Sequence, residues 1–232
     1  MGLFGNKELC PVCGKKMKGD VRIRIKDNVE ICASCSSMVR MDTAMIPNQT
    51  ADDIREHLKY RERNLEKFIR FEPTQEEKAG NFVLYVDGPA GLWYCTKNKR
   101  DGNPPIFAFD ELAGTEYLED GQPVKEEEKK GFLGSLFGEK EEVKAIHSMK
   151  VRISVDNPYT KAVDMEAISP NSELRTGTLS YKNSRRALER VMHLLSEIQT
   201  GASEQAADFA EDTPESGEDV SDPQNDAEST EE

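Results

Sequence analysis

Four of the five cysteines form two C-x2-C pairs, Cys10 with Cys13 in the segment CPVCG and Cys32 with Cys35 in CASCS. Each pair can place two sulfur atoms on one side of a tight turn, and four thiolates suit a tetrahedral zinc ion. Eighteen residues separate the two pairs, a spacing typical of zinc sites. The sequence therefore predicts that these four cysteines bind zinc. Because a shell of four thiolates leaves no position for a substrate water, we expect the zinc to be structural.

Two other uses of these cysteines stay open. Disulfides are disfavoured in a reducing cytosol, and a thioredoxin-like redox pair needs one C-x2-C at the start of a helix that follows a strand. The fifth cysteine, Cys95 in GLWYCTK, shares a strand face with Trp93 if that run is extended. A lone buried cysteine is usually a small hydrophobic residue, so Cys95 is not expected to bind metal.

The segment between the two pairs predicts a hairpin that brings them together. Apolar and basic residues alternate over 21–26, and Asp27-Asn28 offers a turn. Gly14 permits the positive φ that turns backbone N–H groups toward sulfur. So short a segment has little core, and zinc binding, worth on the order of 10–16 kcal/mol in small zinc peptides, would supply most of its folding free energy. Residues 1–45 are therefore predicted to be a small zinc ribbon.

A linking helix is predicted over 50–72. Thr50 is a candidate N-cap with Asp53 at the capping-box position. His57 lies one position from the apolar stripe of this helix, among charged residues, and is expected to be solvated, like His147 and His193. The stripe consists of Ile54, Leu58, Leu65, Phe68 and Ile69.

Residues 80–199 have the pattern of an antiparallel β domain that ends in a helix. The expected strands are NFVLYVDG, PAGLWYCTK, NPPIFAFDEL and GTEYLEDGQPV, followed by AIHSMKVRISVDN, KAVDMEAIS and a short TLSYK. The helix NSRRALERVMHLLSEIQ carries Leu188, Val191, Leu195 and Ile198 on one face. A curved sheet or partial barrel covered by this helix, as in a pleckstrin-homology-like arrangement, satisfies the order. The fold class is α+β, with a flexible loop at about 125–144.

Negative charge is concentrated at the C-terminal end of the chain. Of the 44 Asp and Glu residues, twelve lie in 201–232, where there is no Lys or Arg; the remaining 32 nearly balance the 31 basic residues. Residues 200–232 are therefore predicted to be a disordered acidic tail. No stretch approaches the roughly 18 apolar residues of a membrane helix, and the N-terminus lacks the apolar core of a signal peptide, which predicts a cytoplasmic protein without a transmembrane segment.

Several segments together carry a resemblance to a known family: MGLF, CPVCG, CASCS, IFAFDELAGTEYLEDG, KVRISVDNPYTKAV and SYKNSRRALERVMHLLSEI. In this order they resemble a bacterial domain-of-unknown-function family that begins with a short four-cysteine zinc ribbon. The resemblance covers residues 1 to about 199. It implies zinc at Cys10, Cys13, Cys32 and Cys35, a β-rich second domain and a Gram-positive source, and it supplies no activity. The segment at about 125–144 departs from the family pattern, because relatives often carry a longer glycine-rich apolar stretch there and this sequence has mostly Lys and Glu.

A non-catalytic protein-interaction module is the function that the sequence favours most. The chain has no P-loop, no G-x-S-x-G, no H-E-x-x-H and no Gly-rich dinucleotide signature, which argues against an enzyme. The expected partner is another protein, and the sequence predicts no oligomeric state.

Two alternatives involve other partners. A nucleic-acid-binding zinc ribbon regulated by the acidic tail is one, because the first 45 residues hold eight Lys or Arg against five Asp or Glu. Four thiolates and one zinc reduce this surplus to about +1, a weak charge for phosphate binding. Binding of a lipid headgroup by the β domain, through Lys97, Lys99 and Arg100, is the other, and it rests on fold analogy.

Overall fold

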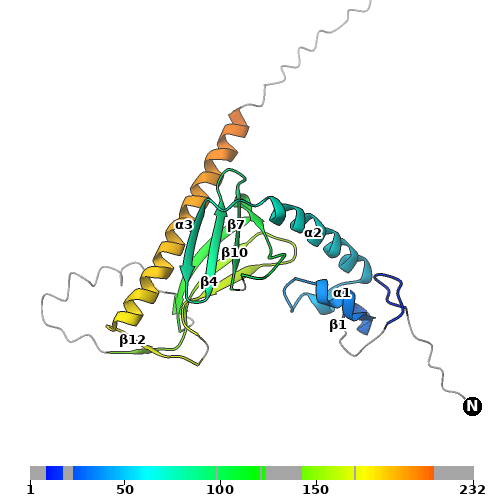
Figure 1. Ribbon diagram of the computed structural model, residues 1–232, viewed down its shortest axis with the longest axis horizontal. Coiled ribbons are helices and arrows are strands. Elements are labelled where there is room, and N and C mark those ends of the chain that lie inside the picture. Colours follow the sequence, from blue (N-terminus) through cyan, green and yellow to red (C-terminus); the bar gives the residue numbers. More distant parts are fainter. Residues whose placement is uncertain are drawn as a thin grey trace, which may run out of the picture.

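The computed structural model describes residues 9–17, 23–97, 99–120, 122–123, 143–169 and 171–211, with the backbone alone for 122–123 and 202–211. Within these residues the protein is α+β, as predicted, with a small N-terminal unit, helix α2, and antiparallel sheets followed by helix α3 (Figure 1). Nearly all of the expected loop at 125–144 lies outside the described residues. So does the expected acidic tail from 212 onward.

The N-terminal unit contains the predicted hairpin. Strand β1 (Ile23–Arg24) pairs antiparallel with β2 (Glu30–Ile31), and the 3-10 turn η1 (Lys26–Asn28) joins them. Asp27 and Asn28 adopt positive φ angles of 57° and 59°, a conformation that Asp and Asn tolerate better than most residues. Two short helices, α1 (Ala33–Met38) and η2 (Ile46–Asn48), complete the unit, which we call the cysteine module (residues 9–49).

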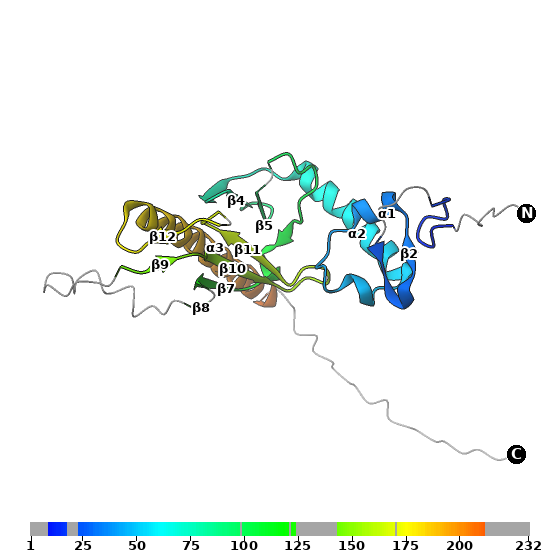
Figure 2. The ribbon, with the colours of Figure 1, turned by 90° about the horizontal axis from the view of Figure 1, so that it is seen from below.

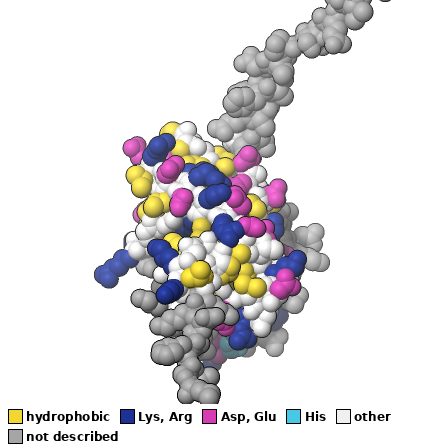
Figure 3. Space-filling model, turned by 90° about the vertical axis from the view of Figure 1, so that its right-hand side faces the viewer, with side chains coloured by type: hydrophobic (Ala, Val, Ile, Leu, Met, Phe, Trp, Pro, Cys, Tyr) yellow, Lys and Arg dark blue, Asp and Glu magenta, His cyan; other side chains and the backbone are white. Residues whose placement is uncertain are grey.

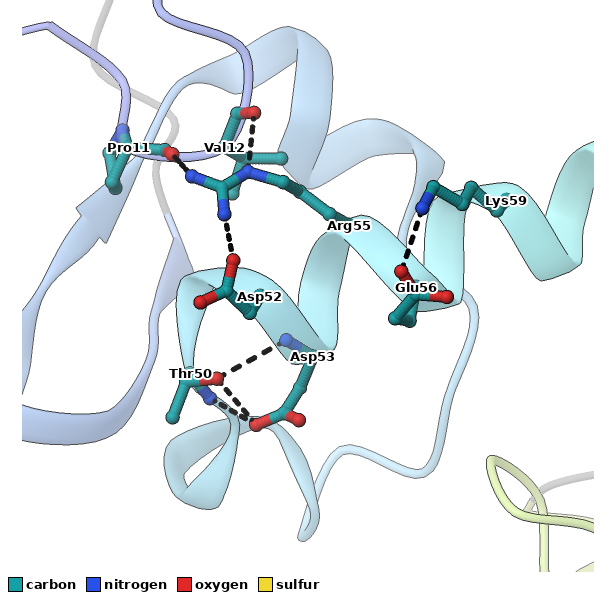
Figure 4. Close-up of polar contacts among 8 residues, drawn as sticks. All are labelled: Pro11, Val12, Thr50, Asp52, Asp53, Arg55, Glu56 and Lys59. Carbon is teal, nitrogen blue, oxygen red and sulfur yellow. Dashed lines mark hydrogen bonds and ion pairs between the residues drawn. The ribbon is translucent and has the colours of Figure 1, made fainter.

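Helix α2 (Ala51–Arg70) follows the cysteine module directly. Its N-terminus has the predicted capping box: the Thr50 hydroxyl accepts a hydrogen bond from the Asp53 N–H at 3.2 Å, and the Asp53 carboxylate accepts one from the Thr50 N–H at 2.8 Å (Figure 4). Two of the N–H groups that a helix start leaves unpaired are thereby satisfied. Hydrogen bonding to Thr50 also lowers the pKa of Asp53.

Replacing Thr50 with Ala is expected to lower the free energy of unfolding by about 1 kcal/mol, because the N–H of Asp53 loses its acceptor. Urea denaturation followed by far-UV circular dichroism measures the change. Thr50→Ser keeps the hydroxyl and is the matched control. Equal stability of the Ala and Ser variants would show that the cap contributes nothing.

The β domain is built from two four-stranded antiparallel sheets. The first has the order β3-β4-β5-β6, and the second has the order β11-β10-β7-β8. Their strands are β3 (Gln75–Ala79), β4 (Phe82–Asp87), β5 (Leu92–Thr96), β6 (Phe107–Ala108), β7 (Leu112–Glu119), β8 (Gln122–Pro123), β10 (Met149–Val155) and β11 (Ala162–Glu166). A separate pair joins β9 (Ala145–Ile146) to β12 (Leu174–Arg175), and η3 (Phe109–Glu111) precedes β7.

One apolar core joins both sheets to helix α3 (Leu179–Glu211), which runs along them (Figures 1 and 2). The four residues predicted for its apolar face, Leu188, Val191, Leu195 and Ile198, are all buried there with Trp93. The two sheets meet closely at Gly80, whose φ is +57°. A Cβ atom at this position would lie 2.5 Å from the carbonyl oxygen of Glu166, so only glycine fits.

Several segments differ from the prediction, among them the following three. Strand β3 starts at Gln75, ahead of the expected domain start at 80, because its polar residues gave no strand pattern. The expected strand TLSYK is wrong: these residues open α3, where the Thr178 hydroxyl accepts from the Tyr181 N–H. Helix α3 also continues to Glu211, into the segment predicted to be a disordered tail from 200. Residues 201–207 include three Ala, one Glu and one Gln, good helix formers that extend a helix that is already packed.

Candidate metal centre

The four predicted metal ligands lie together. Their sulfur atoms all lie within 4.8 Å of one another, with 4.0 Å between Cys10 and Cys35 and 3.7 Å between Cys13 and Cys32. A tetrahedral zinc ion with Zn–S bonds of 2.3 Å separates its sulfurs by about 3.8 Å. A disulfide would place two sulfurs about 2.05 Å apart, and all four cysteines are free. The cluster therefore has the dimensions of a tetrahedral metal site.

The first pair is held by a tight loop. The Cys10 N–H donates to the carbonyl of Lys15, and the Gly14 N–H donates to the carbonyl of Cys10, both at 2.8 Å. Gly14 has a φ of +70°, which confirms the expected positive φ. This loop brings Cys13 back over Cys10 and leaves Cys13 exposed while Cys10 is buried.

The second pair lies at the start of α1. Cys32 is the N-cap residue, and its Sγ accepts a hydrogen bond from the Cys35 N–H at 3.5 Å. The Cys32 N–H in turn donates to Cys10 Sγ at 3.4 Å, which links the two loops. N–H groups directed at sulfur stabilise thiolates over thiols, as metal binding requires. A C-x2-C at a helix start after strand β2 is also the geometry that a redox pair needs.

Electrostatics favour a cation at this cluster. Burial raises the pKa of Cys10, but N–H donors from Cys32, Cys13 and Val12 outweigh it and lower that pKa to about 6. The pKa of Cys35 is raised by burial and by the sulfurs of Cys13 and Cys32 beside it. Four like charges so close together cannot all form without a counter-charge. A divalent metal ion supplies that charge.

Helix α2 supports the cluster through Arg55, which no sequence pattern identified. The Arg55 guanidinium donates to the carbonyls of Pro11 and Val12, at 3.2 Å in the case of Val12, and pairs with Asp52 (Figure 4). Both carbonyls lie between the first two cysteines. Ile54, fully buried, packs into the small core of the cysteine module. The helix is therefore part of the cysteine module's structure as well as a connection.

The prediction that His57 is solvated is wrong. His57 is 0% exposed; its Nε2 accepts the N–H of Arg40 at 2.9 Å, and its ring packs edge-on against Tyr159 at 4.5 Å. Burial, together with the positive charge of Arg61, lowers the pKa of His57 from 6.5 to about 4. Its Nδ1 and Arg61 Nη1 are buried and have no hydrogen-bond partner among the described residues. His147 and His193 are exposed, as predicted.

The same face of α2 binds the β domain. Arg61 donates to the carbonyl of Asn103. Asn64 donates to the carbonyl of Pro104 at 2.7 Å and accepts from the N–H of Ile106 at 2.9 Å. The buried stripe of the helix is Ile54, His57, Arg61 and Asn64, whereas Leu65 and Ile69 of the predicted stripe are exposed. These four positions are spaced by three, four and three residues, so they share one face of the helix.

A second loop of the β domain reaches the cysteine module. The Asp42 N–H donates to the carbonyl of Tyr159 at 2.9 Å, and the Asp42 carboxylate accepts from the N–H of Lys161 at 2.8 Å. In the same loop, the buried Asn157 amide donates to Tyr60 and to Glu111. The module, α2 and the β domain are thus joined to one another by hydrogen bonds.

A scan against protein-family models, a search of curated proteins and a search of solved structures found no match. The resemblance to a bacterial zinc-ribbon family therefore stays a prediction. Among the described residues, no helix is long and apolar enough to cross a membrane.

Proposed function

We propose that this protein binds one zinc ion through Cys10, Cys13, Cys32 and Cys35, and that it acts as a non-catalytic protein-interaction module. The observation that carries the zinc assignment is the sulfur cluster, with separations of 3.7 and 4.0 Å at two of its edges. A set of four sulfurs selects zinc or iron–sulfur chemistry over the hard cations magnesium and calcium. Zinc in such a shell has no open position for substrate, so its role is structural.

The junction with the β domain supports the interaction role. Zinc holds the cysteine module in one shape, and the contacts of Asp42, Arg61 and Asn64 transmit that shape to the loops of the β domain. A metal ion that positions two parts of one surface has a purpose without catalysis. We propose that the partner of this protein is another protein, and that it acts in the cytoplasm.

Charge at the module end of the molecule favours protein over nucleic acid. Figure 3 shows basic and acidic side chains interspersed over this face. Arg24 pairs with Glu30 at 3.5 Å, and Arg55 is directed to backbone carbonyls and Asp52. A phosphate backbone is bound by basic side chains gathered on one face. The mixed signs on this face supply a weaker field.

Elemental analysis of untagged protein tests the zinc assignment. We expect one zinc per chain and its loss in a Cys10→Ser, Cys32→Ser double variant, because two thiolates cannot complete the tetrahedron. Cys95→Ser is the control, since Cys95 packs against the β-domain core, and it should keep one zinc. Folded, metal-free protein with disulfides inside the C-x2-C pairs would instead establish the redox alternative, and one bound iron per chain would make the centre a four-thiolate iron site in place of a zinc site.

A further inference from the structure

A hollow of about 700 Å³ lies between strand β3 and helix α3, away from the cysteine cluster. Its β3 side is formed by Gln75, Glu76 and Glu77, and its α3 side by residues between Arg186 and Glu197. Ligand clefts in proteins commonly have volumes of 300–1,000 Å³, so the hollow has the size of a binding site. It combines a strand edge with a helix face.

Strand β3 borders this hollow. It is the end strand of its sheet, and in the part of the chain that the structure describes it pairs only with β4. The outer side of an end strand presents N–H and C=O groups that can pair with a further strand. Extended peptides bind many proteins by adding a strand to such an edge. The hollow therefore suits an extended peptide.

The helix side gives the hollow a firm wall. Arg190 Nε lies 3.0 Å from Glu77 Oε2, an ion pair that joins α3 to β3. Leu194 lines the hollow and is largely buried, 6% exposed. Residues 186, 190, 193 and 197 are spaced by three or four and share one helix face. Side chains of an added strand that point toward α3 would meet this face.

Charge selects among extended peptides. Four carboxylates, Glu76, Glu77, Glu189 and Glu197, line the hollow with two guanidinium groups, Arg186 and Arg190. Glu77 pairs with Arg190, and Glu189 pairs with Arg185 at 3.1 Å, so the formal net charge with Arg185 included is −1. The acidic segment that follows α3 carries the wrong sign for this site, and a second copy of the same hollow would bring another −1 to it. A peptide rich in Lys or Arg is complementary.

We propose that this hollow binds an extended, basic segment of a partner protein. The segment adds to β3 as a further strand, antiparallel or parallel, and its alternate side chains contact α3. This proposal rests on the proposed role as an interaction protein and names the surface and the partner chemistry. Main-chain hydrogen bonds to β3 supply affinity, and the carboxylates supply the preference for basic side chains.

The test uses zinc-loaded, full-length, ¹⁵N-labelled protein and three capped nine-residue peptides: alternating Lys and Val, alternating Glu and Val, and the Lys peptide with its central Val replaced by Pro. We expect the Lys peptide to shift amide resonances of 75–79 and 186–197. The Glu peptide should bind at least about tenfold more weakly because of its charge. The Pro peptide should also bind more weakly, because it lacks a backbone donor and resists the strand conformation.

A charge variant of the protein completes the test. Glu76→Lys combined with Glu197→Lys should weaken binding of the Lys peptide about tenfold or more, whereas Glu62→Lys, on the exposed side of α2, should leave it unchanged. Equal affinity for the Lys and Glu peptides, or shifts confined to other surfaces, would overturn the proposal. The proposal would also fail if the protein dimerised with rising concentration and Glu76→Lys abolished the dimer. The hollow would then be an interface between two copies of the chain. Zinc content is measured in the same samples. If the protein holds one zinc but does not bind the Lys peptide, the peptide proposal fails and the zinc assignment stands.

Discussion

Chelation of zinc from the loaded protein is expected to unfold the cysteine module, residues 9–49, while the β domain stays folded. The buried apolar residues of this module are few, and three of the nine in its core are the ligands Cys10, Cys32 and Cys35. Metal binding in small zinc modules is worth on the order of 10–16 kcal/mol. So large a fraction of the folding free energy cannot be replaced by the remaining contacts.

The β domain has a different source of stability. Its core holds twenty buried residues, including Trp93, Phe107 and Leu195, and none of them is a metal ligand. Asn64 binds backbone groups of Pro104 and Ile106, so the second half of α2 should stay on the β domain when zinc leaves. The first turn of α2 loses Arg55's carbonyl partners and should fray.

Hydrogen exchange measured by mass spectrometry, with and without a chelator, locates the change. Amides of 23–49 should lose their protection by orders of magnitude, and peptides from β4, β5 and β10 should exchange as before. The fluorescence of Trp93, the sole tryptophan, reports on the β domain in the same samples. Unchanged exchange over 23–49 in metal-free protein would contradict a metal-dependent fold.

The cysteine cluster could be predicted because the chemistry of a metal site is local in sequence. Two C-x2-C pairs fix the donor set, and the alternation around Asp27 fixes the hairpin. The capping box of α2 and the apolar face of α3 follow from short-range rules of the same kind. Each of these features depends on a spacing of a few residues, and the two cysteine pairs are joined by a segment of only eighteen residues.

The buried face of α2 could not be predicted in this way. His57, Arg61 and Asn64 are buried because loops at 101–106 and 156–161 bring backbone carbonyls, an N–H group and an aromatic ring to them from far along the chain. In the sequence, a polar residue that is buried and hydrogen-bonded by distant segments looks the same as a polar residue exposed to solvent. The apolar residues Leu65 and Ile69 gave the stronger pattern and are exposed.

Acid is expected to weaken the contact between α2 and the cysteine module through His57. In the folded protein its pKa is lowered from 6.5 to about 4, because the imidazole is buried and lies near the Arg61 guanidinium. Protonation would also place a hydrogen on Nε2, which now accepts the N–H of Arg40 at 2.9 Å. The ring therefore charges in the unfolded chain well before it charges in the folded protein.

Because the unfolded chain is protonated first, the protein loses stability as the pH falls. Above pH 6.5 both states hold a neutral ring and the full stability is present. Between pH 6.5 and about 4 the unfolded chain takes up a proton that the folded protein excludes, so the free energy of unfolding falls as the pH falls. From pH 7.5 to pH 5, the loss amounts to about 2 kcal/mol.

Two measurements check this expectation. Titration of the His57 ring followed by NMR should give a pKa well below 6.5, and urea denaturation of zinc-loaded protein at pH 7.5 and pH 5 should show the loss. His57→Gln keeps an acceptor for Arg40 but does not titrate, so its stability should fall by about 2 kcal/mol less than that of the wild type over this range. His147→Gln, at an exposed position, controls for the loss of a histidine as such. Parallel pH dependence of the wild type and His57→Gln would mean that the buried imidazole does not set the acid stability of this junction.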